Sequence, residues 1–193
     1  MTRFSLTLAA LVCVGAPAQA DDVRPADIQR WEDGIFILQR VVTDALKGGD
    51  AAAIEVLVEA MRGTAAELDP EGEWNCRTIK MGGVTVITAY RNFKCTITKT
   101  EEGVWSLEKT TGSQRAKGTI RTGGLYTGVG FVGDAPSRTY EETPPDDNTP
   151  AGSADQTVPV IGWFEQMDTN RARLMQPDPV LESEFDVLYL TRE

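Results

Sequence analysis

Two segments near the start of the chain have the spacing of amphipathic helices. Between residues 26 and 47, apolar residues recur at alternating steps of three and four positions, which predicts a helix with one face on a core. This stripe consists of Ile28, Trp31, Ile35, Leu38, Val42 and Ala45, widened by Phe36, Val41 and Leu46. Pro25 suits the first turn of such a helix, and Gly48-Gly49 suits its end.

A second, shorter helix is expected directly after the glycine pair. Asp50 can cap its start, and the apolar positions run to Met61 before the chain reaches Gly63. Its expected apolar face consists of Ile54, Leu57, Val58 and Met61. Residues 21–72 are therefore predicted to form a helical hairpin that packs on the rest of the same domain.

From residue 73 onward the pattern changes to short runs of β-forming residues separated by glycines and polar turns. Nine strands are expected: Trp74–Lys80, Val84–Tyr90, Phe93–Thr98, Val104–Lys109, Gln114–Arg121, Leu125–Val132, Val160–Gln166, Arg171–Met175 and Phe185–Leu190. No crossover helices separate them, so parallel pairing is excluded. The fold class is therefore α+β and mainly β: an N-terminal αα-hairpin followed by an antiparallel meander that forms a small barrel or a strongly curved sheet.

The expected core of this β part, residues 73–193, is aromatic and aliphatic. It includes Trp74, Phe93, Ile97, Trp105, Leu107, Phe164 and Leu188. Within the β part, residues 133–157 contain four prolines and many acidic groups, which predicts a long surface loop. The glycines of Gly128-Val129-Gly130-Phe131-Val132-Gly133 match a nucleotide-binding pattern, but no helix follows them. They are interpreted as allowing curvature or close approach within a strand.

The first twenty residues have the parts of a secretory signal peptide. Arg3 precedes an apolar run from Leu6 to Val14, and Ala18-Gln19-Ala20 forms a small-x-small cleavage site. Residues 1–20 are therefore expected to be removed, leaving 21–193 as a single domain with no integral membrane segment. The expected location is periplasmic or secreted.

Cys76 and Cys95 are the two cysteines that remain beyond this leader. In an oxidising compartment they most simply form a structural disulfide. A redox-active or metal-binding pair is the alternative, although the chain has no Cys-x-x-Cys spacing and no third soft ligand beside them. No metal site and no cofactor are expected.

Composition removes several classes of function. The 193 residues include no histidine, so the chain alone cannot form a Ser-His-Asp triad, a Cys-His dyad or a His-ligated zinc site. The formal net charge of −10 argues against nucleic acid as a partner. Residues 73–133 are nevertheless basic, with nine Lys or Arg against four Asp or Glu. Either the acidic flanks neutralise this segment in the fold, or it forms an anion-binding face.

Several segments resemble a known family in order and spacing. They are Trp74-Asn75-Cys76-Arg77-Thr78-Ile79-Lys80, Tyr90 to Cys95, Lys109 with Gly112-Ser113-Gln114-Arg115, Arg173-Leu174 with Pro177-Asp178-Pro179, and Glu182-Ser183 before Asp186-Val187. Together they are similar to the bacterial domain-of-unknown-function family numbered 4893, over nearly all of the chain beyond the leader. The resemblance implies a kinship and a compartment. It implies no activity and no catalytic residue.

Two functional hypotheses remain after these exclusions. In the first, the protein is a non-catalytic periplasmic binding or envelope-accessory module that binds an anionic ligand, an envelope saccharide or a protein partner. The expected ligand-binding residues are Arg77, Gln114, Arg115, Arg173 and Glu182. In the second, the protein is a carboxylate-dependent hydrolase of envelope glycans, with Glu182 as the acid. The arginines could equally pair with Glu182, Glu184 or Asp186 and only tie strands together.

Overall fold

The two helices begin and end where the glycine and capping signals predict. The computed structural model describes residues 23–133, 138–143 and 157–193, so the predicted leader and much of the predicted loop lie outside the described residues. Helix α1 spans Pro25–Gly48, with proline in its first turn, and α2 spans Ala51–Met61. The carboxylate of Asp50 accepts a hydrogen bond of 3.0 Å from the backbone N–H of Ala53 and so caps α2. No helix in these ranges is long and apolar enough to span a membrane.

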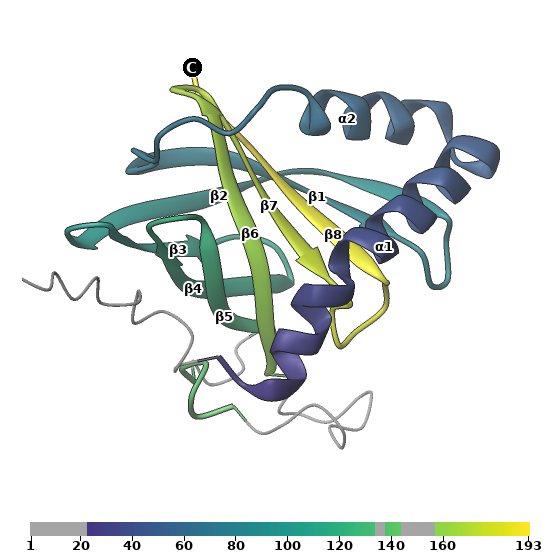
Figure 1. Ribbon diagram of the computed structural model, residues 1–193. Coiled ribbons are helices and arrows are strands. Elements are labelled where there is room, and N and C mark those ends of the chain that lie inside the picture. The colour runs from purple at the N-terminus through teal and green to yellow at the C-terminus, as the bar shows by residue number, and fades with distance from the viewer. Residues whose placement is uncertain (1–22, 134–137, 144–156) are drawn as a thin grey trace, which may run out of the picture.

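Eight antiparallel strands follow the helices and close into a barrel (Figure 1). They are β1 Gly72–Met81, β2 Ile87–Glu101, β3 Val104–Lys109, β4 Gln114–Arg121, β5 Leu125–Val132, β6 Val158–Asp168, β7 Arg171–Pro177 and β8 Phe185–Thr191. Each strand pairs with the next along the chain, and β8 pairs back on β1, from Asn75↔Thr191 to Met81↔Phe185. The predicted meander is confirmed, and its closure is complete.

The expectation of nine strands is wrong because two of the predicted strands are one. β2 covers both Phe93–Thr98 and most of Val84–Tyr90, and it contains a bulge opposite Thr78 of β1. The extra residue reverses the alternation of side chains. Before the bulge, Ile87 points to the outer face, whereas after it Cys95 points into the barrel. The interrupted pattern therefore looks like two strands in the sequence.

Apolar packing occurs in two separate layers. The first fills the barrel and includes Trp74, Leu107 and Phe164, with Phe93 packed at its edge. The disulfide between Cys76 and Cys95 crosses from β1 to β2 within this layer, and neither cysteine is exposed. The second layer lies between the helices and the outer face of the barrel, where α1 packs on β6, β7 and β8 and α2 packs on β2, β1 and β7. The helical hairpin thus covers one side of the barrel (Figure 1).

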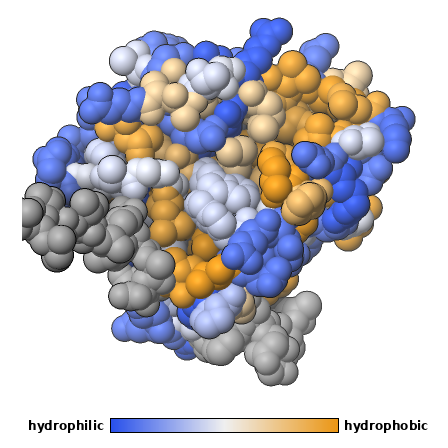
Figure 2. Space-filling view, viewed as in Figure 1, coloured by the Kyte–Doolittle hydropathy of each residue, from blue (hydrophilic) through white to orange (hydrophobic). Residues whose placement is uncertain are grey.

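The face that α1 turns to the barrel differs from the predicted stripe. Asp27, Arg30, Gly34, Val41 and Ala45 are buried, at steps that a helix places on one side. Gly34 is required there, because a Cβ atom at this position would lie 2.1 Å from the ring of Trp163. Figure 2 shows that apolar surface gathers where α1 and α2 meet. The large apolar side chains that these two helices leave exposed are Ile28, Ile35, Phe36, Leu46 and Val58.

Candidate functional site

A cavity of about 100 Å³ lies at one end of the barrel. This end, here called the mouth, is where β1, β3, β5 and β7 finish and where β4, β6 and β8 begin. The cavity is lined by Thr78, Lys80, Lys109, Gln114, Arg115, Ala116, Gly130, Phe131, Val132, Val158, Val160, Gln176, Pro179, Val180, Leu181, Asp186 and Leu188. Pro179, Val180 and Leu181 come from the β7–β8 loop.

Strand alternation explains why charged side chains reach the inside of the mouth. In β3, Trp105 and Leu107 point into the barrel, and Lys109 continues the same alternation at the end of the strand. Lys80 continues the inward series of β1 in the same way, and Asp186 begins that of β8. The barrel interior is therefore apolar along its length and charged at the mouth.

Lys109 is a buried cation at the mouth. Its ammonium group donates a hydrogen bond to the backbone oxygen of Gln114 and lies 4.2 Å from the centre of the Phe93 ring. Burial, with smaller contributions from the neighbouring charges of Lys80 and Arg115, lowers the pKa of Lys109 to about 8. Among the described residues, none offers Lys109 a carboxylate within ion-pair distance.

Arg115 brings to the same cavity a second positive charge that has no ion-pair partner among the described residues. Its side chain makes no hydrogen bond or ion pair with any residue that the structure describes, and its Nε atom is buried. A buried donor without an acceptor costs free energy, so such a group calls for an explanation. Lys109 and Arg115 together leave the mouth with donors that have no anionic partner in the described part of the chain.

The third cation of the mouth, Lys80, is already paired. Its ammonium group donates to Glu182 at 2.8 Å, and the amide of Gln114 donates to the same carboxylate oxygen at 3.0 Å. These two hydrogen bonds lower the pKa of Glu182. Glu182 has a positive φ of 73°, which is uncommon for a residue with a side chain. Glu182 therefore ties the β7–β8 loop to β1 and β4 across the mouth.

Asp186 is the second carboxylate at the mouth, and it is almost fully buried. Burial raises its pKa to about 6, against the opposing influence of Lys80 and of the hydrogen bond that Ser183 donates to it at 2.6 Å. Glu182 contributes to the upward shift because like charges disfavour ionisation. The two carboxylates thus differ in the pH at which they take up a proton.

The structure brings together three of the five residues expected to bind a ligand. Gln114 and Arg115 line the mouth cavity, and Glu182 lies at its rim. The other two lie elsewhere. Arg77 donates to the backbone oxygen of Tyr90 on the exposed surface. Arg173 is buried outside the barrel, where it pairs with Glu165 and donates to the backbone oxygen of Ala60 in α2 at 3.2 Å.

Sequence reasoning did not assign Lys80, Lys109 or Asp186 to the site. Their signal was present, because each is a charged residue at an inward position of a strand whose other inward residues are mostly apolar. To recognise this signal, one must know which side chains of each strand point into the barrel. The bulge in β2 made this alternation hard to follow in the sequence.

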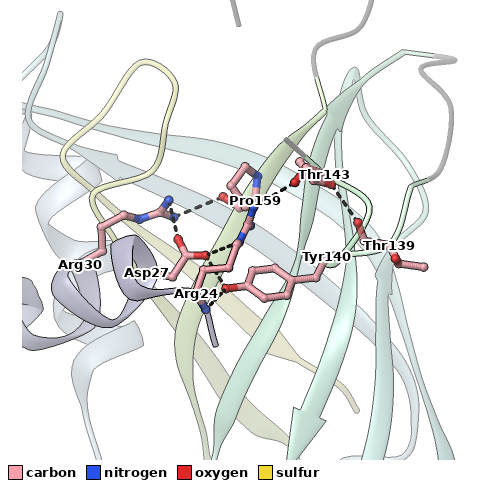
Figure 3. Close-up of polar contacts among 7 residues, drawn as sticks. All are labelled: Arg24, Asp27, Arg30, Thr139, Tyr140, Thr143 and Pro159. Atoms are coloured by element: carbon pink, nitrogen blue, oxygen red, sulfur yellow. Dashed lines mark hydrogen bonds and ion pairs between the residues drawn. The ribbon is translucent and has the colours of Figure 1, made fainter. Parts of the chain in front are cut away.

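A second buried polar cluster lies where α1 begins (Figure 3). The carboxylate of Asp27 pairs with Arg24 at 3.1 Å and with Arg30 at 3.0 Å, and it accepts a hydrogen bond from the hydroxyl of Tyr140. Arg30 also donates to the backbone oxygen of Pro159 in β6 at 3.2 Å. The cluster joins α1, β6 and residues 138–143, which indicates a structural role.

Comparison with known proteins places the chain in a family but transfers no activity. No curated protein and no solved structure matches it. The model of the family described as "Domain of unknown function (DUF4893)" matches residues 20–190. The match covers both helices and almost the entire barrel. The chain therefore belongs to the DUF4893 family, as the resemblance of its motifs implied.

Proposed function

We propose that this protein is an exported, non-catalytic binding module whose mouth cavity holds a small anionic ligand. The observation that carries the proposal is the pair of cations, Lys109 and Arg115, that line one cavity without a carboxylate partner among the described residues. Keeping two positive charges close together in a partly buried site costs free energy. An anion bound between them would offset that cost with charge-assisted hydrogen bonds.

Arg173 provides the contrast that supports this reading. It is a buried arginine whose guanidinium is occupied by Glu165 and by a backbone oxygen. A purely structural role predicts this kind of pairing. Arg115 has no such partner in the part of the chain that the structure describes, and therefore fits a ligand site better than a tie between strands.

Export is part of the proposal and has separate support. Residues 1–20 have the composition of a cleavable leader, and the Cys76–Cys95 disulfide suits an oxidising compartment. Of the partners considered from the sequence, a saccharide fits the mouth best if it carries an acid group. A protein partner would have to insert an acidic side chain into a cavity of about 100 Å³.

The test compares two arginine variants by calorimetric titration with acetate, benzoate, sulfate and inorganic phosphate. We expect at least one of these anions to bind, and Arg115→Ala to weaken its binding by about tenfold or more without lowering the melting temperature. Arg173→Ala is the matched control, expected to lower the melting temperature and to leave the dissociation constant unchanged. The proposal fails if none of the four anions binds at millimolar concentration, or if Arg115→Ala binds as tightly as wild type.

One observation favours the hydrolase as a second candidate. The pKa values of Glu182 and Asp186 are shifted in opposite directions, as in a pair that divides the roles of base and acid. The assignment differs from the sequence expectation, because Asp186 and not Glu182 is the carboxylate that holds its proton more tightly. Asp186→Asn should then abolish turnover of envelope glycan fragments, measured as released reducing ends. Wild-type protein that releases none would eliminate this candidate.

A further inference from the structure

The wall of the mouth cavity is divided into a charged part and an apolar part. Lys80, Lys109 and Arg115 come from β1, β3 and β4. The apolar side chains come from β5, β6, β8 and the β7–β8 loop, and they are Phe131, Val132, Val158, Val160, Pro179, Val180, Leu181 and Leu188. A site built only for an inorganic anion would surround it with donors. This site has its cationic donors on one part of its wall, and mostly hydrocarbon on the rest, interrupted by Gln176 and Asp186.

The apolar segment of the β7–β8 loop is held against the mouth at both ends. Pro179, Val180 and Leu181 lie between Asp178 and Glu182, which both have positive φ values, 43° and 73°. Side chains rarely tolerate this backbone conformation, so the surrounding contacts must impose it. Glu182 binds Lys80 and Gln114, and the backbone N–H of Asp178 donates to the oxygen of Glu184 at 2.9 Å. These contacts keep three apolar residues at the cavity.

The charges at the mouth leave room for one negative charge. Three cations, Lys80, Lys109 and Arg115, face two carboxylates, Glu182 and Asp186. Glu182 neutralises Lys80, and the charges of both residues influence the pKa of Asp186. One positive charge is therefore in excess. A monoanion balances it, whereas a phosphate monoester at neutral pH carries between one and a half and two negative charges.

We propose that the ligand of the mouth cavity is a monocarboxylate with an apolar body, such as a short aliphatic or aromatic acid. This inference rests on the anion-binding function proposed above. The carboxylate binds Lys109 and the fork of Arg115, and the hydrocarbon part lies against Val158, Val160 and Leu181. Sulfate and phosphate fit less well, because some of their oxygens would lose water against valine side chains without gaining a donor.

Chain length is the variable that tests this inference. Acetate, butyrate and hexanoate are titrated calorimetrically into the wild-type protein, with hexan-1-ol and inorganic phosphate as comparisons. We expect the dissociation constant to fall by up to about fourfold for each methylene that the cavity buries. Hexanoate should bind more tightly than phosphate. Hexan-1-ol, which lacks the charge, should bind more weakly than hexanoate.

The outcomes separate this inference from the function on which it rests. If phosphate or sulfate binds more tightly than every carboxylate, or if chain length has no effect, anion binding stands and the ligand class proposed here is wrong. If none of the anions binds, both proposals fall. Hexan-1-ol that binds as tightly as hexanoate would show an apolar site without anion recognition, which also contradicts both.

A pair of valine variants tests the apolar part of the wall directly. Val160→Thr replaces a methyl group in the cavity with a hydroxyl of nearly the same size, and should weaken hexanoate by about fivefold while leaving acetate unchanged. Val129→Thr is the control, because Val129 is buried on β5 but does not line the cavity. Equal effects of both variants on hexanoate would overturn the proposed placement of the hydrocarbon part.

Discussion

Burial at the mouth disfavours the charged forms of both Asp186 and Lys109. Because one is an acid and the other a base, they make opposite contributions to the pH dependence of stability. The folded state raises the pKa of Asp186 to about 6 from an ordinary value of 3.8. Between these values the folded protein holds a proton that the unfolded chain has released, so the contribution of Asp186 to stability declines as pH rises. Lys109 has a pKa lowered from 10.5 to about 8, so its contribution rises with pH between these two values.

Asp186→Asn should therefore stabilise the protein increasingly as the pH rises from 4 to 7. The asparagine has no charge to bury, and a shift of about two pKa units corresponds to at most about 3 kcal/mol. The measurement is the free energy of unfolding in urea at several pH values. Asp44→Asn, at an exposed position of α1, serves as the control for net charge. A difference between variant and wild type that stays constant from pH 4 to pH 7 would contradict the assignment.

At the scale of residues, three of the five predicted ligand-binding residues lie at the mouth and two lie elsewhere. Gln114, Arg115 and Glu182 lie together at the mouth. All five residues were chosen as polar residues on or beside predicted strands, and only three-dimensional contacts reveal that Glu165 pairs with Arg173. Whether a residue belongs to a site depends on which face of its strand it occupies and on partners that are distant in the chain. Neither can be read from local spacing.

At the scale of elements, α1 is held to the barrel by a buried ion cluster as well as by apolar contacts. Asp27→Ala should destabilise the protein by about 3 kcal/mol or more, because it leaves the buried Arg30 and the hydroxyl of Tyr140 without the carboxylate that they share. Asp33→Ala, on the exposed surface of the same helix, should change the free energy of unfolding by less than about 0.5 kcal/mol.

Urea unfolding of both aspartate variants checks this prediction. A loss of less than about 1 kcal/mol in Asp27→Ala would mean that water replaces the carboxylate and that the cluster does not hold the helix. Tyr140→Phe measures separately how much the hydroxyl of Tyr140 contributes to the free energy of unfolding, because it removes one hydrogen bond to Asp27 and keeps the ring.

The sequence predicted where the two helices begin and end, but not which face of α1 is buried. The ends of both helices could be predicted, since proline, the glycine pair and the Asp50 cap act locally. The buried face of α1 could not be predicted. Trp163, from a distant strand, packs so closely on α1 that only a glycine fits at position 34, and the ion cluster around Asp27 buries polar residues on the same face. Ile35, expected in the core, is half exposed as a result. Long-range partners decided both outcomes.

At the scale of the whole molecule, the disulfide links the first two strands of the barrel inside its core. The Cys76 and Cys95 bond closes a loop with a sequence separation of 19, which is worth about 3 kcal/mol in the loop-entropy model. Reduction should therefore lower the urea midpoint substantially, and a Cys76→Ala, Cys95→Ala double variant should unfold near the reduced midpoint. A midpoint that is unchanged after both thiols have been shown to be free would contradict this prediction.

The closure of β8 on β1 also limits how other molecules can associate with this protein. An open sheet presents unpaired backbone N–H and C=O groups along its outer strands, and extended peptides or sister chains can add to them. In the described barrel every strand has two neighbours, so no strand lies along its whole length at an open edge. The part of β2 that precedes Cys95 pairs with β1 alone, so strand addition would have to occur there. Where both sides of a strand are paired, recognition depends on side chains at the mouth, in the loops and on the outer faces of the two helices.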